Sequence, residues 1–491
     1  MAKRKKLNKA LSVIFFILGI AVLTGTNYYI NNYSLDDLEA VISTFAHKQA
    51  GVNFEVYLKG AKIVLFSLLF QLLIWVPLFY EGKSSLKIII KDKEFRLLPL
   101  FKKKSIKLIA SIILFIGSLF YADNKLKIID YIKTSKQTTT IYLDEFIDPR
   151  DVKITFPEKK RNLIHIVIES METSTFSSKN GGDYETSVTP ELERIALNNT
   201  NFSSTNIVGG FLSNQGATYT AGSLVAQETG INIKPYLSNS TAFGSHLKGL
   251  YTLGDILHDA GYNNAIVMGS DADFANRRDY YSSHNYKIYD YLYAKEINFI
   301  PSDYRVWWGF EDEKLYELAK DEIYKLNEDD KPFNITILTA DTHFLDGYTD
   351  STCPNTKSSL YLNSYQCASI KIDKFLNWAR KQDFYKDTTI VITGDHLTMQ
   401  KGVFDEENRY VYNAFINSPL KTTNNRNRVI TTTDMFPTIL ASMGVEIEGN
   451  RLGFGTNLYS NEKTISERMG LSNFNTELSK HSLEYYKLIF E

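Results

Sequence analysis

Acidic residues and histidines follow three apolar segments of this sequence, at the point where each segment ends. Glu169 follows residues 162–168, Asp341 and His343 follow residues 333–339, and Asp395 and His396 come after residues 388–393. If these segments are parallel strands of one sheet, their carboxyl ends meet at one edge. Carboxylates and imidazoles together suit a divalent cation such as zinc or manganese. Singly, each could be a solvated loop residue or a helix cap, but three agreeing edges favour a metal site.

A glycine-rich turn that enters a helix supplies hydroxyl groups. Residues 216–226 read GATYTAGSLVA, with Thr218 and Thr220 at the expected start of the helix. A hydroxyl at a helix N-terminus lies beside backbone N–H groups that bind phosphoryl anions, and a metal would lower its pKa further. Threonine is also a common helix cap. The spacing by itself leaves both the nucleophile and the cap open.

Strand-like and helix-like segments alternate around these residues. Four short, β-branched runs predict buried strands: residues 162–168, 263–268, 333–339 and 388–393. Helical patterns start at Thr189-Pro190-Glu191 and cover residues 250–260, 310–326 and 361–382, with Gly261 as a C-terminal stop. This alternation predicts a doubly wound α/β domain with a mostly parallel central sheet.

Three apolar runs precede this domain: Leu11–Ile30, Ile63–Tyr80 and Ile106–Ala122. A hydrocarbon core of about 30 Å needs roughly 20 helical residues, so the first two runs qualify and the third is marginal. The third could instead be a buried or interfacial helix. The first could be a signal peptide, but no small-x-small cleavage site follows it, so it is expected to be an anchor.

Basic residues predict the orientation of the apolar runs. They are concentrated before the first run, at Lys3, Arg4, Lys5, Lys6 and Lys9, and between the second and third runs, at Lys83, Lys87, Lys91, Lys93, Arg96, Lys102, Lys103 and Lys104. These segments are expected to be cytoplasmic, which places everything after Ala122 outside. We therefore expect a multi-pass transmembrane region of about three helices (residues 1–122), a juxtamembrane linker (123–158) and an extracytoplasmic catalytic domain (159–491).

Overall composition excludes several other classes. The 491 residues carry a formal net charge of −1, which argues against bulk electrostatic capture of nucleic acid. Two cysteines cannot form a zinc ribbon or a disulfide-stapled scaffold. Trp307 and Trp308 could form an aromatic wall for a substrate, lie at a membrane interface or belong to the core.

At these residues the chain resembles the sulfatase/alkaline-phosphatase-superfamily transferases of bacterial envelopes, in particular the lipoteichoic acid synthases and the periplasmic-glucan phosphoglycerol transferases. The similar stretches are NLIHIVIESMETS (162–174), TYTAGSLVAQETGI (218–231), FANR (274–277), WGFEDEKLY (308–316), TADTHFLDGY (339–348), TGDHLTM (393–399), TTDMFPTILASMG (432–444) and RLGFGTNLYS (451–460). The resemblance covers the whole outer domain and implies a sulfatase-like fold there.

The resemblance also implies roles for particular residues. Glu169, Asp395 and His396 would be ligands of a divalent metal, usually Mn²⁺, with Mg²⁺ or Zn²⁺ as other choices. Thr220 would be the catalytic nucleophile and would also touch the metal. His343 and Arg277 would bind the phosphoryl group and the donor head group.

Departures from the family pattern narrow the expected activity. Ala275 stands where the lipoteichoic acid synthases carry a tryptophan, and Val167 where they carry a histidine, which moves the resemblance toward the glucan-type enzymes. Neither cysteine lies in a C/S-x-P-x-R motif, so sulfate ester hydrolysis is not expected. The family has a disulfide in a similar place to Cys353 and Cys367; two free buried thiols are the alternative.

The resemblance therefore implies a membrane-anchored, metal-dependent phosphoglycerol transferase. It would move glycerol phosphate from phosphatidylglycerol in the bilayer to a hydroxyl of a cell-envelope glycan or glycolipid, through a phospho-threonine intermediate. One alternative is a phosphoethanolamine transferase of the same fold. Another is a non-catalytic envelope protein that only binds lipid or glycan.

Overall fold

The computed structural model describes residues 2–33, 54–79, 86–90, 93–97, 104–234, 247–405 and 407–490. These residues form two compact units, one that reaches to Ile132 and one that begins at Lys133.

The first unit consists mainly of three long helices, α1 (Ala2–Asn32), α3 (Phe54–Phe79) and α4 (Lys104–Leu126), with a small antiparallel hairpin of β1 (Leu86–Ile90) and β2 (Lys93–Leu97). Few polar side chains join the helices. The hydroxyls of Ser12 on α1 and Ser111 on α4 lie 3.2 Å apart. The amide of Gln71 on α3 donates to the Thr24 hydroxyl at 3.0 Å. Such isolated polar contacts between apolar helices are typical of helix packing in lipid.

Two helices in the described part of the chain are long and apolar enough to cross a membrane, Leu7–Asn32 and Ile106–Leu126. Only 28% and 22% of their most apolar windows are buried, so neither resembles the core helix of a soluble protein. The third predicted run, Ile106–Ala122, thus belongs to a longer apolar helix than its sequence pattern indicated. The second, within α3, contains the shorter apolar stretch Gly60–Gln71, and its last residue, Tyr80, lies outside the described residues. So do residues 34–53, 81–85, 91–92 and 98–103 of the loops whose charges predict the orientation.

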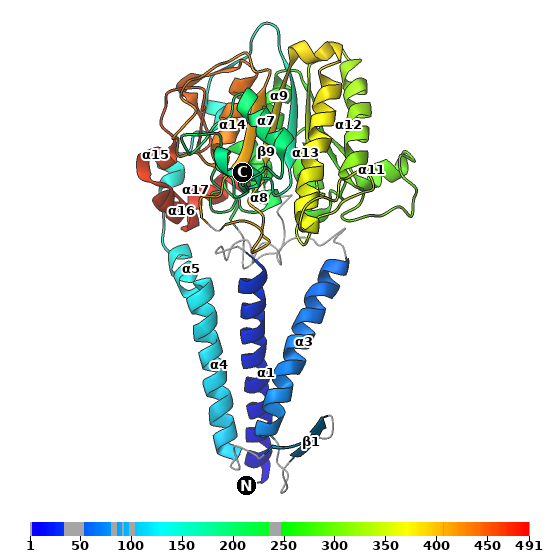
Figure 1. Ribbon diagram of the computed structural model, residues 1–491. Helices are drawn as coiled ribbons and strands as arrows, with labels where there is room; N and C mark the ends of the chain where they lie inside the picture. Colours follow the sequence, from blue (N-terminus) through cyan, green and yellow to red (C-terminus); the bar gives the residue numbers. More distant parts are fainter. Residues whose placement is uncertain are drawn as a thin grey trace. The chain divides into compact units, whose positions relative to one another are not determined.

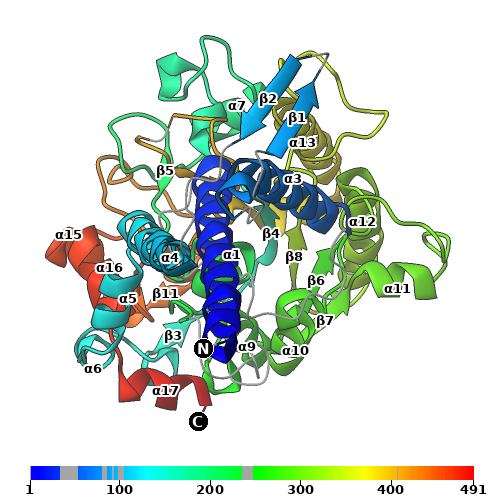
Figure 2. The same cartoon turned by 90° about the horizontal axis from the view of Figure 1, so that it is seen from below.

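The second unit is built on a seven-stranded sheet with the strand order β5-β10-β9-β4-β8-β6-β7 among the described residues. Its strands are β5 (Gly210–Phe211), β10 (Val411–Ile416), β9 (Thr388–Gly394), β4 (Asn162–Ile168), β8 (Phe333–Leu338), β6 (Asn263–Met268) and β7 (Tyr286–Tyr289). The five strands from β9 to β7 are parallel, and β10 and β5 are antiparallel to their neighbours. Figure 2 shows β4, β8, β6 and β7 in succession. All four predicted strands are present and parallel.

Helices cover both faces of this sheet. Ile164, Ile166 and Ile168 of β4 pack in one core with α7, α11, α12 and α13, whereas Leu163 and Val167 point into cores shared with α8, α9, α10 and α14. The bounds are α7 (Pro190–Asn198), α8 (Thr220–Thr229), α9 (Leu253–Asp259), α10 (Arg277–Ser283), α11 (Tyr291–Glu296), α12 (Asp312–Asn327), α13 (Leu360–Ala379) and α14 (Met435–Ser442). Figure 1 shows α12 and α13 side by side. The predicted doubly wound α/β arrangement is confirmed, and the four predicted helices differ from α7, α9, α12 and α13 only at their ends.

Shorter elements complete the chain. They are α5 (Ile128–Ser135), α6 (Ile141–Asp144), α15 (Ile465–Met469), α16 (Leu471–Ser479), α17 (Leu483–Phe490), β3 (Ile154–Thr155), β11 (Glu446–Ile447), β12 (Arg451–Leu452) and β13 (Gly455–Thr456). Tyr142 on α6 packs edge-on against Phe454 and against Tyr485 of α17, with ring centroids 5.1 and 5.2 Å apart. The segment predicted as a linker therefore contributes side chains to the core of the second unit.

Glu228 on α8 is a buried carboxyl that is surrounded by tyrosines. The hydroxyls of Tyr280 and Tyr286 both donate to it at 3.3 Å. Burial raises the pKa of Glu228 to about 8, because a charge there is poorly solvated. The folded protein therefore keeps this proton over a pH range in which the unfolded chain, with an ordinary pKa of 4.5, has lost it.

Glu228→Gln is consequently expected to stabilise the protein at neutral and alkaline pH. A raised folded-state pKa means that stability is fully present below about pH 4.5 and is lost as pH rises toward 8, by roughly 3 kcal/mol at pH 7. The glutamine variant lacks this loss. Thermal unfolding of the full-length protein in detergent between pH 4 and 8 should show a difference in Tm that grows with pH. A constant difference across this range would contradict the assignment.

Candidate active site

Glu169, Asp395 and His396 meet at the carboxyl edge of the sheet. Ile168 and Gly394 are register partners in β4 and β9, so the residues that follow them emerge side by side. One ligand atom of each of the three residues lies within 4.8 Å of the others. All three are buried, at 3%, 0% and 1% exposure. Sequence analysis expected these residues at one edge, and the structure brings them together.

The residue before Asp395 is Gly394, and a close approach of the backbone at Met171 requires a glycine there. A Cβ atom at Gly394 would lie 2.1 Å from the carbonyl oxygen of Met171, so a larger residue would push the two strand ends apart. The Asp395 carboxylate then accepts hydrogen bonds at 2.7 Å from the backbone N–H groups of Ser170 and His396 through Oδ1. These bonds leave the other oxygen, Oδ2, directed at the cluster.

The hydrogen bonds of the cluster leave acceptor atoms facing one another. The Nδ1–H of His396 donates to the carbonyl of Leu397 at 2.7 Å, which leaves the Nε2 lone pair for the cluster. This Nε2 lies 3.3 Å from Asp395 Oδ2 and 3.5 Å from Glu169 Oε1. Asp395 Oδ2 is buried and has no hydrogen-bond partner in the described part of the chain. Two buried carboxylates and an imidazole lone pair in contact fit a divalent cation, because a cation is the group that all three would bind.

The charges of the cluster shift its pKa values in opposite directions. Burial, together with the charge of Glu169, raises the pKa of Asp395 to about 7. Burial acts against ionisation of Glu169 too, but His343, His396 and two hydroxyl hydrogen bonds lower its pKa below the ordinary value. Two adjacent buried carboxylates thus resist ionising together, which is the electrostatic condition that a bound cation relieves.

Thr220 is the first residue of α8 and points at the cluster. Its hydroxyl donates to Glu169 Oε2 at 3.1 Å and lies 3.4 Å from His396 Nε2. The N-cap residue of α8 is Tyr219, whose side chain makes no capping hydrogen bond. The spacing of the sequence left two roles open for Thr220, a helix cap and a nucleophile. The structure excludes the first, because the hydroxyl of Thr220 does not cap the helix.

Two polar residues on α8 hold Thr220 in this position. The Ser223 hydroxyl donates to the carbonyl oxygen of Asp395, and the Gln227 amide donates to that of Gly394 at 3.1 Å. Because both residues lie on the face of α8 that meets the end of β9, they join the helix to the loop that carries Asp395 and His396. Sequence reasoning missed these two residues, since nothing in their local pattern distinguishes them from helix-surface positions.

His343 lies in the loop after β8. The Nδ1–H of its ring donates to the carbonyl oxygen of Phe344, and its ring packs against Trp308 with centroids 4.6 Å apart. Burial lowers the pKa of His343, and the nearby charge of Glu169 opposes this shift. The imidazole is therefore held neutral beside the cluster, and an anion bound next to it would favour its protonated form.

Arg277 is a buried cation at the start of α10. Its guanidinium donates to the carbonyl oxygens of Phe274 and Asp271 and to the hydroxyl of Ser270 at 2.9 to 3.0 Å. Among the described residues it makes no ion pair with a carboxylate. Burial lowers its pKa to about 10, which still leaves it charged at neutral pH. A buried cation that makes no direct ion pair can still bind an anion.

The loop that carries His343 is fastened to α13. Lys371 donates to Asp341 at 2.9 Å and to Asp350 at 2.6 Å, and is itself 2% exposed. One turn earlier on the same helix, Cys367 is bonded to Cys353, with an S–S distance of 2.00 Å and a Cα–Cα distance of 5.1 Å. Asp341, which its position after a strand suggested as part of a metal site, pairs with Lys371 instead. The edge of β8 therefore contributes His343, not a carboxylate, to the site.

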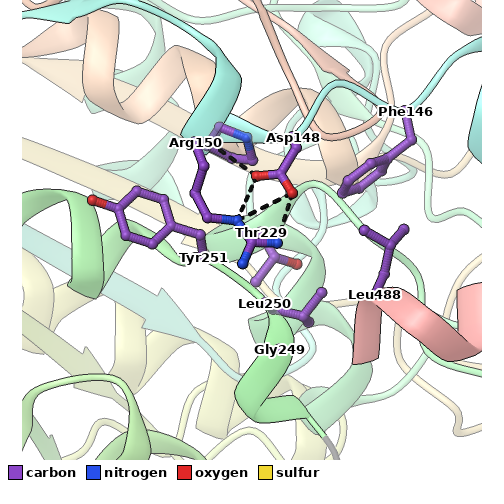
Figure 3. Close-up of a pocket in the computed structure, with 9 residues that line it drawn as sticks. Phe146, Asp148, Arg150, Thr229, Gly249, Leu250, Tyr251 and Leu488 are labelled. Carbon is purple, nitrogen blue, oxygen red and sulfur yellow. Dashed lines mark hydrogen bonds and ion pairs between the residues drawn. The ribbon is translucent and has the colours of Figure 1, made fainter. Parts of the chain in front are cut away.

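A small cavity lies away from this cluster in the same unit. Figure 3 shows a small cavity at the Asp148–Arg150 ion pair, with Thr229, Tyr251 and Leu488 also in its lining. Its volume of about 10 Å³ is enough for one water molecule and far too small for a lipid head group. None of its lining residues belongs to the cluster around Glu169.

The buried carboxylates and the histidine thus lie at the carboxyl edge of a mostly parallel sheet. An alkaline-phosphatase-superfamily protein from Vibrio parahaemolyticus has the same fold, with a TM-score of 0.51, 20% identity, and coverage of 69% of this chain and 79% of that one. A sulfatase family model matches residues 161–445, more than half of the chain. The chain belongs to the sulfatase family.

Two further relatives extend the comparison. The integral membrane lipooligosaccharide phosphoethanolamine transferase A of Neisseria meningitidis shares the fold over 89% of this chain and 84% of its own, with a TM-score of 0.51 and 14% identity. Phosphoglycerol transferase I of Salmonella arizonae is 32% identical over 256 residues, which are 50% of this chain and 32% of that protein. The similarity thus spans about a third of the length of the Salmonella relative.

Proposed function

We propose that this protein is a phosphoglycerol transferase, which moves glycerol phosphate from phosphatidylglycerol to a hydroxyl group of a cell-envelope glycan or glycolipid. The single observation that carries the proposal is the placement of the Thr220 hydroxyl 3.1 Å from Glu169, in a buried cluster that fits a divalent cation. The 32% identity to the Salmonella phosphoglycerol transferase supports the choice of donor.

Within this proposal the ligands of the metal are Glu169, Asp395, His396 and the hydroxyl of Thr220. When bound, a divalent cation lowers the pKa of a coordinated hydroxyl and balances charge on the phosphoryl group. Mn²⁺ is the proposed metal, because the mixed oxygen and nitrogen donors are compatible with it and the resemblance favours it.

The reaction proceeds in two displacements. In the first, Thr220 Oγ1 forms a bond to phosphorus while the bond from phosphorus to the diacylglycerol oxygen breaks. The proton that the Thr220 hydroxyl gives up is matched by one that the departing diacylglycerol oxygen takes up. In the second, an acceptor hydroxyl loses its proton as it attacks the same phosphorus, the bond from phosphorus to Thr220 Oγ1 breaks, and Thr220 Oγ1 regains a proton. Arg277 and His343 stabilise the charge on the phosphoryl oxygens in both steps.

The membrane helices fit this donor. A phospholipid does not leave the bilayer, so a transferase that uses one must be held at the membrane surface. We propose that the chain crosses the membrane more than once and that its catalytic domain lies on the extracytoplasmic side, where envelope glycans are found. The basic segments before the first apolar run and between the second and third support this orientation.

The test is incubation of the full-length protein with vesicles that contain phosphatidylglycerol and Mn²⁺. We expect release of diacylglycerol and, in mass spectra of the digested protein, a glycerophosphate adduct on the peptide that contains Thr220. A parallel incubation with phosphatidylethanolamine addresses the second candidate, a phosphoethanolamine transferase, which the fold shared with the Neisseria enzyme over 89% of the chain favours. Diacylglycerol from phosphatidylethanolamine alone would decide for that alternative.

A further inference from the structure

Trp308 carries a buried N–H group that the fold does not use. The residue is 8% exposed, and its Nε1 has no hydrogen-bond partner among the residues that the structure describes. The neighbouring Trp307, by contrast, donates its Nε1–H to the carbonyl of Ala340 at 3.0 Å. Native proteins seldom leave a buried donor unpaired, because its lost hydration is not replaced. The indole N–H is therefore available to a partner that is not part of the polypeptide.

The indole packs against one of the two residues that we propose to bind the phosphoryl group, and Phe274 links it to the other. Its ring centroid is 4.6 Å from that of His343 and 5.3 Å from that of Phe274. The guanidinium of Arg277 in turn lies over the ring of Phe274, 5.5 Å from its centroid. The four side chains form one continuous wall, which we call the head-group wall: Phe274, Arg277, Trp308 and His343.

An unused acceptor lies in the same segment. Asn276 directly precedes Arg277 and is 7% exposed, and its Oδ1 has no hydrogen-bond partner in the described part of the chain. Its backbone has a φ of 55°, the left-handed conformation that asparagine tolerates better than most residues. One unpaired donor and one unpaired acceptor thus accompany the cation and the histidine of the site.

The loops that carry these groups are fixed to one another before any ligand binds. Phe310 N–H donates to the carbonyl of Gly269 at 3.0 Å, and Arg277 binds the hydroxyl of Ser270. A Cβ at Gly309 would lie 2.1 Å from the Gly269 carbonyl oxygen, so the two loops touch through their backbones. Unpaired groups in such a preorganised wall gain more from a ligand than groups that must first be ordered.

We propose that the Trp308 indole N–H and the Asn276 side-chain oxygen bind the hydroxyl groups of the glycerol head group, and so select the donor lipid. This inference rests on the proposed phosphoglycerol transfer. A hydroxyl both accepts and donates hydrogen bonds, so the two glycerol hydroxyls satisfy both residues. A primary ammonium only donates, so an ethanolamine head group would satisfy Asn276 and leave the indole N–H unpaired. The wall therefore discriminates against phosphatidylethanolamine by the hydrogen bond that it cannot form.

The test removes the indole N–H and the lipid hydroxyls separately and together. Full-length wild type and Trp308→Phe, which keeps an aromatic ring, are assayed for diacylglycerol release from vesicles of phosphatidylglycerol and of phosphatidylpropanol, whose head group has no hydroxyl. We expect Trp308→Phe to lower kcat/KM for phosphatidylglycerol about 5- to 10-fold, the effect of one lost hydrogen bond, and to leave that for phosphatidylpropanol within about twofold. Asn276→Gly keeps the positive φ. It should likewise lower kcat/KM for phosphatidylglycerol and leave that for phosphatidylpropanol nearly unchanged.

Trp307→Phe is the matched control. It removes an indole N–H that serves the fold, so its effect should be the same on both lipids. An equal loss on both lipids with Trp308→Phe would show that its indole is structural and would overturn the inference. So would an unchanged rate with phosphatidylglycerol. Failure of the wild type to release diacylglycerol from phosphatidylglycerol would instead refute the proposed function, so the two failures are distinguishable.

Discussion

Thr220→Ala is expected to abolish release of diacylglycerol from phosphatidylglycerol, with a fall in rate of about 10⁴-fold or more, as for removal of other enzymatic nucleophiles. The reason is geometric: the hydroxyl of Thr220 does not cap α8 and instead donates to Glu169 at 3.1 Å. Alanine favours helices, so α8 should still form. The measurement is diacylglycerol release from vesicles, together with the mass of the peptide that contains residue 220.

Thr220→Ser is the control for this substitution. Serine keeps a hydroxyl at the same position, so it should retain far more activity than alanine and should still acquire the glycerophosphate adduct. If Thr220→Ala released diacylglycerol at the wild-type rate, threonine would not be the nucleophile. If cells that carry the alanine variant also behaved like the wild type, this would support the other alternative. In that alternative the protein is not an enzyme and only binds envelope lipid or glycan.

Asp395→Asn is expected to remove the response of the protein to divalent cations. In the wild type, a cation at about 100 times its Kd should stabilise the folded state by about 2.7 kcal/mol and raise Tm accordingly. The amide of asparagine keeps the shape of Asp395 but loses a charged ligand, so this rise should largely disappear. Without added metal the variant should be at least as stable as the wild type, because it removes one of two adjacent buried carboxylates.

Thermal unfolding of the full-length protein with Mn²⁺, Zn²⁺, Mg²⁺ or a chelator measures this effect without an activity assay. Glu193→Gln is the matched control, because Glu193 is a buried carboxyl on α7 that binds Ser177 and Asn180 and lies outside the cluster. Its cation response should equal that of the wild type. An Asp395→Asn variant with an undiminished rise in Tm would show that any cation binds elsewhere. The same measurements rank the three metals by the rise in Tm that each produces. The donor set alone does not give this ranking.

Local patterns were sufficient for the parallel centre of the fold. Residues 162–168, 263–268, 333–339 and 388–393 are short, β-branched and bounded by polar residues, and all four are parallel strands in the structure. Since buried parallel strands must be apolar on both faces, this signal is strong within a single sequence. The antiparallel strand β10 (Val411–Ile416) was missed, because Asn413 interrupts its apolar pattern. That residue is fully buried and pairs with the backbone of Phe202, a partner that no local pattern shows.

The sequence by itself determined which chemical groups reach one edge of the sheet. Glu169, Asp395 and His396 directly follow their strands, and His343 lies in the loop after its strand. Because the strands are parallel, these ends meet at the same edge. The sequence did not determine what each group touches there. Only the tertiary structure directed the Thr220 hydroxyl at Glu169 rather than at its helix end, paired Asp341 with Lys371, and left Trp308 without a partner beside His343. The physical reason is that the positions of the buried strands follow from short-range apolar patterns, whereas a hydrogen bond depends on atoms that are distant in sequence and must approach within about 3 Å.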